Sequence, residues 1–127
     1  KLHLADSTNI DIDTFERETL KELGMPKELP MRHRTPHFGH VFSSEGYAAA
    51  YYGYMWAEVL TADAAEAFME APGGFYDEEV GERLVKYLFS VRNAMDPAEA
   101  YRKFRGRDAK VDALMRDRGF PLPENKN

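Results

Sequence analysis

The chain has 127 residues, of which 43% are apolar and 31% charged, with a formal net charge of −5 and no cysteine. A chain of this length can bury roughly two thirds of its unfolded surface, which predicts a single domain with one core. The acidic balance disfavours a general nucleic-acid binder, the lack of cysteine excludes disulfides and thiolate zinc sites, and no window approaches the ~18 apolar residues of a membrane span.

The first part of the chain combines one short helical pattern with a long stretch of loop-forming residues. Asp13 and Glu16 resemble a capping box and predict a first helix over residues 14–23. Residues 24–46 hold three prolines together with glycines and serines, which predicts an irregular connection. Because long loops inside compact domains are uncommon and often functional, this loop is a candidate site segment.

A Tyr-rich helical pattern follows the loop and predicts a helix over residues 47–71, either continuous or restarted near Thr61 or Asp63. Three tyrosines of this helix fall at i, i+4 and i+7 and would share one face: Tyr47, Tyr51 and Tyr54. The opposite arc is predicted to belong to the core and carries Tyr52, Met55, Trp56, Val59 and Leu60.

Three further helical patterns complete the chain. Carboxylates at residues 77–79 precede an apolar helical repeat that reaches Val91. The sequence Asp96-Pro97-Ala98-Glu99 is the clearest helix start, and Gly106 ends that helix. A last helix carries apolar residues from Val111 and ends at Gly119. No convincing alternating strand pattern is present, so the sequence predicts an all-α fold.

The tyrosines of the central helix suggest a functional site. Tyrosines at helical spacing are ordinarily core residues whose hydroxyls find local partners. Here they follow His37, His40 and a Gly/Ser hinge, which favours a binding or catalytic role. A tyrosine hydroxyl, with an ordinary pKa near ~10, can donate a hydrogen bond to an oxyanion at neutral pH without becoming charged. A histidine can do the same or bind a peptide carbonyl.

A self-contained metal site is a weaker hypothesis. His33, His37 and His40 are spaced so that one helical face could ligate zinc, but Pro36 opposes a helix there. The HExxH motif is absent, so we expect no metal ligand in this chain. The sequence also lacks the GxSxG elbow of serine hydrolases and a glycine-rich phosphate loop.

Three stretches resemble a known family. HFGHVFSSEGYAAAYYGYMWAEVLTADAAEAF, residues 37–68, resembles a C-terminal region of the thimet oligopeptidase family of zinc metallopeptidases (peptidase family M3), and most closely its bacterial peptidyl-dipeptidase branch. ELPMRHRTPHF and FRGRDAKVDALMRDRGF resemble the same branch. The similarity runs from about Leu2 to Pro121, almost the whole chain.

The resemblance implies that the chain is the C-terminal helical portion of a larger, mostly helical catalytic domain. The zinc ligands of the family lie upstream of the matched region, so it implies zinc in the intact enzyme and none bound by this chain alone. It also implies that His40, Tyr47 and Tyr54 stabilise the transition state. His40, Tyr51 and Gly46 would contact the peptide substrate.

We therefore expect part of a peptidyl-dipeptidase, an enzyme that removes dipeptides from peptide C-termini, and an isolated chain that is inactive. The alternative is a non-catalytic helical module that binds peptides or partners. Expected partners are the peptide substrate and the remainder of the catalytic domain, without nucleic acid or membrane, and uncovered helix faces favour self-association. The chain begins at Lys1 without an export signal, so the cytoplasm is the expected location.

Overall fold

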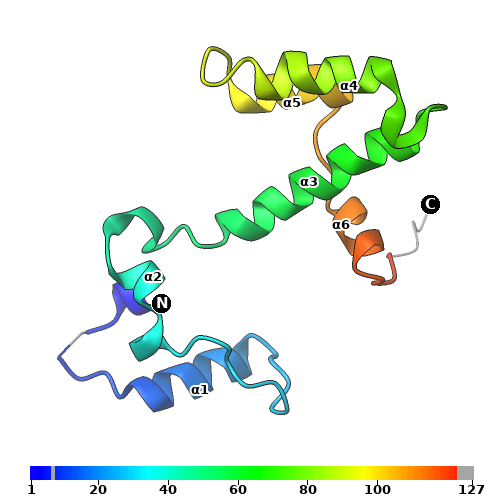
Figure 1. The fold of residues 1–127 in the computed structure, drawn as a ribbon. Helices are drawn as coiled ribbons and strands as arrows, with labels where there is room; N and C mark the ends of the chain where they lie inside the picture. The colour runs from blue at the N-terminus through cyan, green and yellow to red at the C-terminus, as the bar shows by residue number, and fades with distance from the viewer. Residues whose placement is uncertain (7, 123–127) are drawn as a thin grey trace. The chain divides into compact units, whose positions relative to one another are not determined.

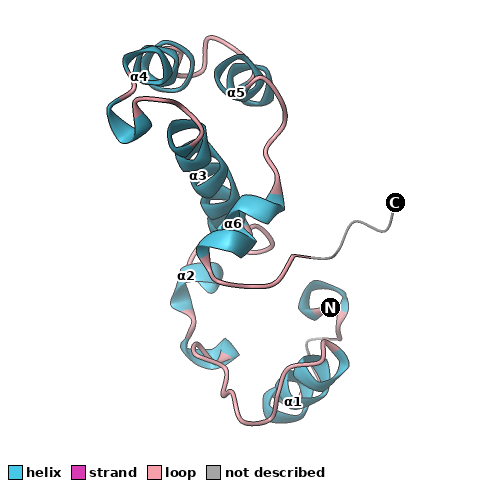
Figure 2. Ribbon diagram, turned by 90° about the vertical axis from the view of Figure 1, so that its right-hand side faces the viewer, coloured by secondary structure: helices cyan, strands magenta, loops and turns pink. Residues whose placement is uncertain are grey.

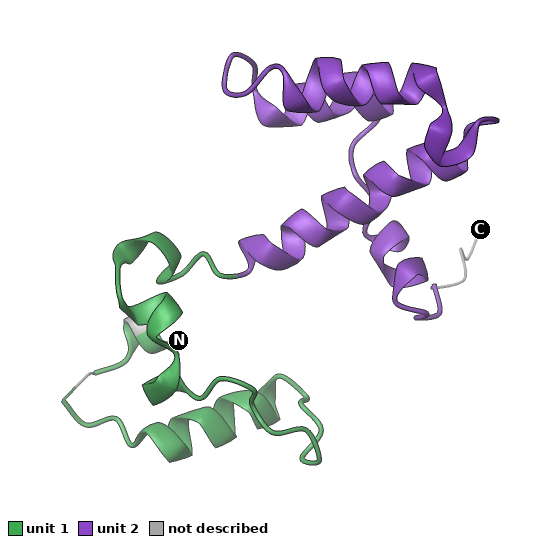
Figure 3. Ribbon diagram, in the orientation of Figure 1, with its two compact units in different colours: residues 1–51 green, residues 52–127 purple. Residues whose placement is uncertain are grey.

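The structure is a computed structural model that describes residues 1–6 and 8–122. These residues form helices, turns and loops without a strand, which confirms the all-α class (Figure 2). The chain divides into two compact units, residues 1–51 and 52–127, each made from one continuous stretch (Figure 3). The single domain predicted from chain length stays a prediction. Within the described part, every helix is too short or too polar to cross a membrane.

The first unit contains α1, Ile12–Glu22. Its N-cap is Asp11, whose carboxylate accepts a hydrogen bond from the Thr14 N–H at 2.7 Å. The predicted start at residue 14 behind a capping box of Asp13 and Glu16 is therefore wrong. The box does not form because the Glu16 side chain pairs with residues of the following loop instead of with its own helix end.

The loop of residues 24–46 is less irregular than its composition predicts. After turns at residues 23–29 it contains three short helical turns: η2 (Thr35–His37), α2 (Gly39–Phe42) and η3 (Glu45–Tyr47). Pro36 occupies an early position of η2, where its missing N–H has no helical partner to lose. Pro36 is therefore compatible with η2, and α2 and η3 contain no proline.

The second unit is built on the long helix α3, Gly53–Met69. Helix α4, Glu78–Leu84, continues into a π-helical turn at Val85–Phe89 (η5), and α5 spans Pro97–Arg105. Helices α4 and α5 lie side by side, and α6, Val111–Asp117, packs against α3 (Figure 1). The apolar helical repeat predicted to reach Val91 therefore ends two residues earlier, in the π turn that closes at Phe89.

The core of this unit lies where α3, α4 and α5 meet. Its buried members are Ala67, Val80, Tyr101 and Phe104. Half-buried apolar side chains surround them, among them Leu60, Ala64, Phe68, Leu84 and Leu88. Removing this apolar area from water is the main stabilising contribution to the unit.

The prediction of a helix over residues 47–71 is wrong at its N-terminal end. Residues 48–52 form turns, and the Ala48 and Ala50 N–H groups donate to carbonyls three residues back at 3.3 Å. The α-helix then runs without interruption through Thr61, whose hydroxyl donates to the Ala57 carbonyl at 2.9 Å. Tertiary contacts of the tyrosine rings, described below, override the helix propensity of this Ala-rich stretch.

The predicted core arc of this helix is only partly correct. Val59 is buried and Leu60 half-buried, but Tyr52, Met55 and Trp56 are 74%, 60% and 53% exposed. The buried residues of α3, Val59, Asp63 and Ala67, lie in its later turns. The first turns of α3 are therefore left uncovered within this unit.

The start of α5 agrees with its sequence signal. The Asp96 carboxylate accepts the Glu99 N–H at 2.9 Å, Pro97 is the first helical residue, and Gly106 ends the helix at φ 79°. Asp96→Ala removes the acceptor and is expected to lower the free energy of unfolding by about 1 kcal/mol, whereas Asp96→Asn keeps an acceptor. Urea unfolding followed by circular dichroism measures both. Equal losses in the two variants would contradict the capping role.

Candidate functional site

The segment that carries the candidate histidine is anchored to α1. Glu16 of α1 is 7% exposed and accepts hydrogen bonds from the Thr35 N–H and from Arg34 Nε, the latter at 2.9 Å. The hydrogen bond from Thr35 is the main reason that the pKa of Glu16 lies below its ordinary value, and Arg34 lowers it further. The chain is thus fixed at the first residue of η2, a few residues ahead of His40.

The rings of the first unit gather around His40. The His40 ring stacks on Tyr47 with centroids 4.7 Å apart, and Tyr51 meets it edge-on at 5.6 Å. Phe38 packs edge-on against Tyr51 at 4.8 Å and also stacks with His33 at 4.8 Å. Aromatic pairs in these geometries are favourable beyond their buried area, so the cluster holds the two tyrosines by their rings.

This cluster joins three of the predicted site residues, His40, Tyr47 and Tyr51. The tyrosines remain 40% and 41% exposed, so part of each side chain is accessible from solvent. An imidazole and two phenols next to one another can bind the carbonyl oxygens of a peptide, since each of these groups can donate a hydrogen bond. Phe38 was not predicted as a site residue from the sequence, although it lies within the histidine-containing segment, between His37 and Gly39.

Gly46 lies in η3 with an ordinary negative φ. A Cβ placed there would meet only Ser44 Oγ, at 3.7 Å, which is an ordinary contact. This conformation therefore does not require a glycine, and the predicted substrate contact at Gly46 stays a prediction.

Tyr54 belongs to the second unit, in the first turn of α3, and is 46% exposed. The predicted common helical face of Tyr47, Tyr51 and Tyr54 is wrong, because the α-helix begins only at Gly53. The first two tyrosines are held by His40 in a different backbone conformation.

Helix α3 is fixed within its unit by a buried carboxylate, Asp63, which is 0% exposed. The Tyr101 hydroxyl donates to Asp63 Oδ2 at 2.7 Å, while Arg107 Nη1 lies 2.8 Å from Oδ1 and Arg105 Nε lies 3.3 Å from Oδ2. Arg105 also makes a two-pronged pair with Glu70, both distances being 2.7 Å. These contacts bind α3 to α5 and to the segment after it.

Both sides of the buried Asp63 and Tyr101 pair show perturbed acidity. Burial by itself raises the pKa of Asp63, but the Tyr101 hydroxyl and the two guanidinium groups outweigh it and bring the pKa below its ordinary value of 3.8. Burial and the neighbouring carboxylate raise the pKa of Tyr101. Asp63 is therefore ionised and Tyr101 protonated at neutral pH.

The side chains of the candidate site do not form a zinc ligand set. Across the described residues, no three histidine, aspartate or glutamate side chains gather in a way that could hold a metal ion. His33 and His40 instead both stack against Phe38, with His40 6.3 Å from it between centroids. The hypothesis of zinc held by His33, His37 and His40 gains no support from this geometry.

Comparisons with known proteins identify the family of this chain. Residues 2–120 match the model of peptidase family M3. The chain is 36% identical over 117 residues to oligopeptidase A of Haemophilus influenzae and 34% identical over 114 residues to dipeptidyl carboxypeptidase of Escherichia coli. It is also 36% identical over 112 residues to the organellar oligopeptidase A of Arabidopsis thaliana.

The chain belongs to peptidase family M3, a family of metallopeptidases. The three matches cover 91%, 88% and 85% of the chain but only 16%, 16% and 14% of those relatives. The chain thus spans about one sixth of the length of the relatives it matches. Relatives named oligopeptidase A and dipeptidyl carboxypeptidase match at similar identity, 36% and 34%, so the matches define the family and not one of these two activities.

Proposed function

We propose that the chain is the C-terminal part of a zinc-dependent peptidyl-dipeptidase of family M3. The observation that carries the proposal is the ring cluster of His40, Tyr47 and Tyr51 in a chain whose family acts on peptides. The zinc ligands and the general base would come from the remainder of the intact protein, since the residues that the structure describes include no cluster of three potential ligands.

The residues of this chain act on the substrate through hydrogen bonds. Tyr47 and Tyr54 donate hydrogen bonds from their hydroxyl groups to the oxygen of the scissile carbonyl, where negative charge develops, and His40 adds a further hydrogen-bond donor. Tyr51 and Gly46, together with His40, contact the bound peptide and orient it. Such donors accelerate the reaction only if they bind the developing oxyanion more strongly than the ground-state carbonyl.

A cleavage assay on the intact protein tests the proposal. The substrates are a short peptide with a free C-terminus and its C-terminally amidated twin, and the products are identified by mass spectrometry with and without a chelator. We expect chelator-sensitive release of dipeptides from the free C-terminus and little release from the amidated peptide. The chain by itself is expected to cleave neither.

The other outcomes each correct a different part of the proposal. Internal cleavage of both peptides at equal rates would replace the peptidyl-dipeptidase with an oligopeptidase, the activity named by relatives such as oligopeptidase A of H. influenzae. Binding of the peptides by the intact protein without any cleavage would favour a non-catalytic peptide-binding module.

A further inference from the structure

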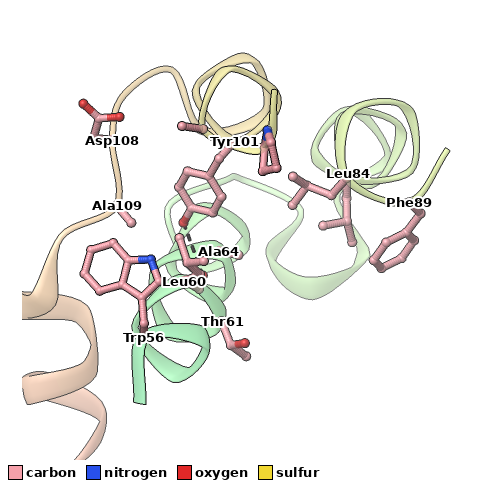
Figure 4. A pocket seen from close by; sticks show the side chains of 12 residues that line it. Trp56, Leu60, Thr61, Ala64, Leu84, Phe89, Tyr101, Asp108 and Ala109 are labelled. Atoms are coloured by element: carbon pink, nitrogen blue, oxygen red, sulfur yellow. Dashed lines mark hydrogen bonds between the residues drawn. The ribbon is translucent and has the colours of Figure 1, made fainter. Parts of the chain in front are cut away.

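An apolar pocket of about 770 Å³ opens in the second unit between α3, the π turn after α4, and α5. Its principal side chains are Trp56, Leu60, Leu84, Leu88, Phe89 and Tyr101. Figure 4 shows Trp56 and Leu60 of α3 near Tyr101, with Leu84 and Phe89 on the neighbouring helix. All of these residues belong to one unit, and none is among the site residues predicted from the sequence.

Two large aromatic side chains of the pocket are more than half exposed to solvent. Phe89 is 66% exposed and Trp56 is 53% exposed. Phe89 is the last residue of the π turn, which is closed by a hydrogen bond from the Ser90 N–H to the Val85 carbonyl five residues back at 2.8 Å. Apolar surface gathered in this way is unfavourable in water unless something covers it.

The chemistry of the lining selects an apolar occupant. The Tyr101 hydroxyl is turned to Asp63 and to the Leu60 carbonyl, so it is already committed within the unit. Among the lining residues, Thr61, Asp108 and the indole N–H of Trp56 supply the other polar groups, and the remaining side chains are apolar. A peptide substrate would leave its amide groups unpaired against such a wall, whereas the apolar face of a helix would not.

The size of the relatives indicates where such a helix comes from. The chain covers 16% of oligopeptidase A of H. influenzae and 16% of dipeptidyl carboxypeptidase of E. coli, so most of a family M3 protein lies outside it. We propose that the apolar pocket is the docking site for an apolar helix face from the remainder of the peptidase in the intact protein. This proposal rests on the proposed function, because it requires that the chain is part of a longer peptidase.

Placing a charge at the pocket tests this docking. Phe89→Asp puts a carboxylate where the chain alone is open to water, so the melting temperature of the chain should change little. In the intact protein the same carboxylate would be buried without a partner, and the melting temperature should fall sharply. Phe89→Leu is the matched control and should leave both proteins near the parent value.

Thiol labelling gives a second measurement if the charged variant of the intact protein fails to fold. The chain has no cysteine, so Phe89→Cys introduces its one thiol. We expect labelling by a maleimide at this position to be more than ~10-fold slower in the intact protein than in the chain alone. Lys103→Cys, at an exposed residue of α5 that pairs with Glu99 at 2.9 Å, should label at similar rates in both.

The remaining outcomes overturn the proposal. Fast labelling at position 89 in both proteins would mean that the pocket stays open, and an equal loss of stability in both would make Phe89 part of the unit's own core. The pocket would instead bind a second copy of the chain if the chain formed a dimer that Phe89→Asp disrupts while the stability of the intact protein did not change. None of these readouts uses peptidase activity, so failure of the proposed cleavage would be recognised separately.

Discussion

Replacing Asp63 by alanine is expected to lower the free energy of unfolding of the chain by about 3–5 kcal/mol, the range for removing one member of a buried ion pair. Asp63 is fully buried, and its loss would leave Arg105, whose side chain is 8% exposed, without one of its two acidic partners. The Tyr101 hydroxyl would lose its 2.7 Å partner as well. Urea unfolding followed by the helical circular dichroism signal measures the change.

Glu58 provides the matched control on the same helix. Its carboxylate pairs with Arg118 of the segment after α6, but its side chain is 52% exposed. Exposed pairs contribute little, so Glu58→Ala should cost at most about 1 kcal/mol. Similar small losses for Asp63→Ala and Glu58→Ala would show that the buried network does not hold α3 to α5.

The same carboxylate predicts how stability depends on pH. Because the folded pKa of Asp63 lies below the ordinary value of 3.8, its contribution is fully present above that value and is lost as the pH falls through the folded pKa. The parent chain should therefore lose stability below about pH 4 more steeply than Asp63→Ala. Parallel pH profiles of the two proteins would contradict the ionised, paired state.

Replacing Tyr54 by phenylalanine in the intact enzyme is expected to lower kcat/KM by about 10²- to 10³-fold, the usual loss for one oxyanion donor. The change removes only a hydroxyl from a side chain that is 46% exposed at the start of α3, so folding should be preserved. Zinc content should also be unchanged, because Tyr54 belongs to no cluster of potential metal ligands among the described residues. Kinetics with a fluorogenic peptide and metal analysis measure the two effects.

Tyr52 offers the control, since it lies two residues earlier, is 74% exposed and has no proposed role. Tyr52→Phe should leave kcat/KM near the parent value. The split between kcat and KM is informative for Tyr54→Phe, because a donor used only in the transition state lowers kcat with little change in KM. An unchanged kcat/KM would remove Tyr54 from the proposed mechanism.

Capping residues in the sequence were sufficient to predict a helix end where its hydrogen bonds involve only neighbouring residues. The start of α5 at Asp96 and Pro97 and its end at Gly106 follow from the hydrogen-bonding capacity and backbone freedom of those residues alone. The same kind of signal misplaced the start of α1, since Asp11 and Asp13 both carry a carboxylate two residues apart and only the former caps. A capping box at Asp13 would need the Glu16 side chain to bond back to the helix start. Glu16 instead accepts a hydrogen bond from the Thr35 N–H, nineteen residues later.

The sequence by itself determined the all-α class, the family and the residue types of the candidate site, because helical periodicity, capping residues and the family motif are properties of short stretches. Only the tertiary structure decided that Tyr47 and Tyr51 pack on His40 instead of continuing the helix, and that Asp63 is a buried ion-pair centre rather than a possible helix cap. Both outcomes depend on partners distant in the sequence or on ring packing, and helix propensity is too weak to prevail against such contacts.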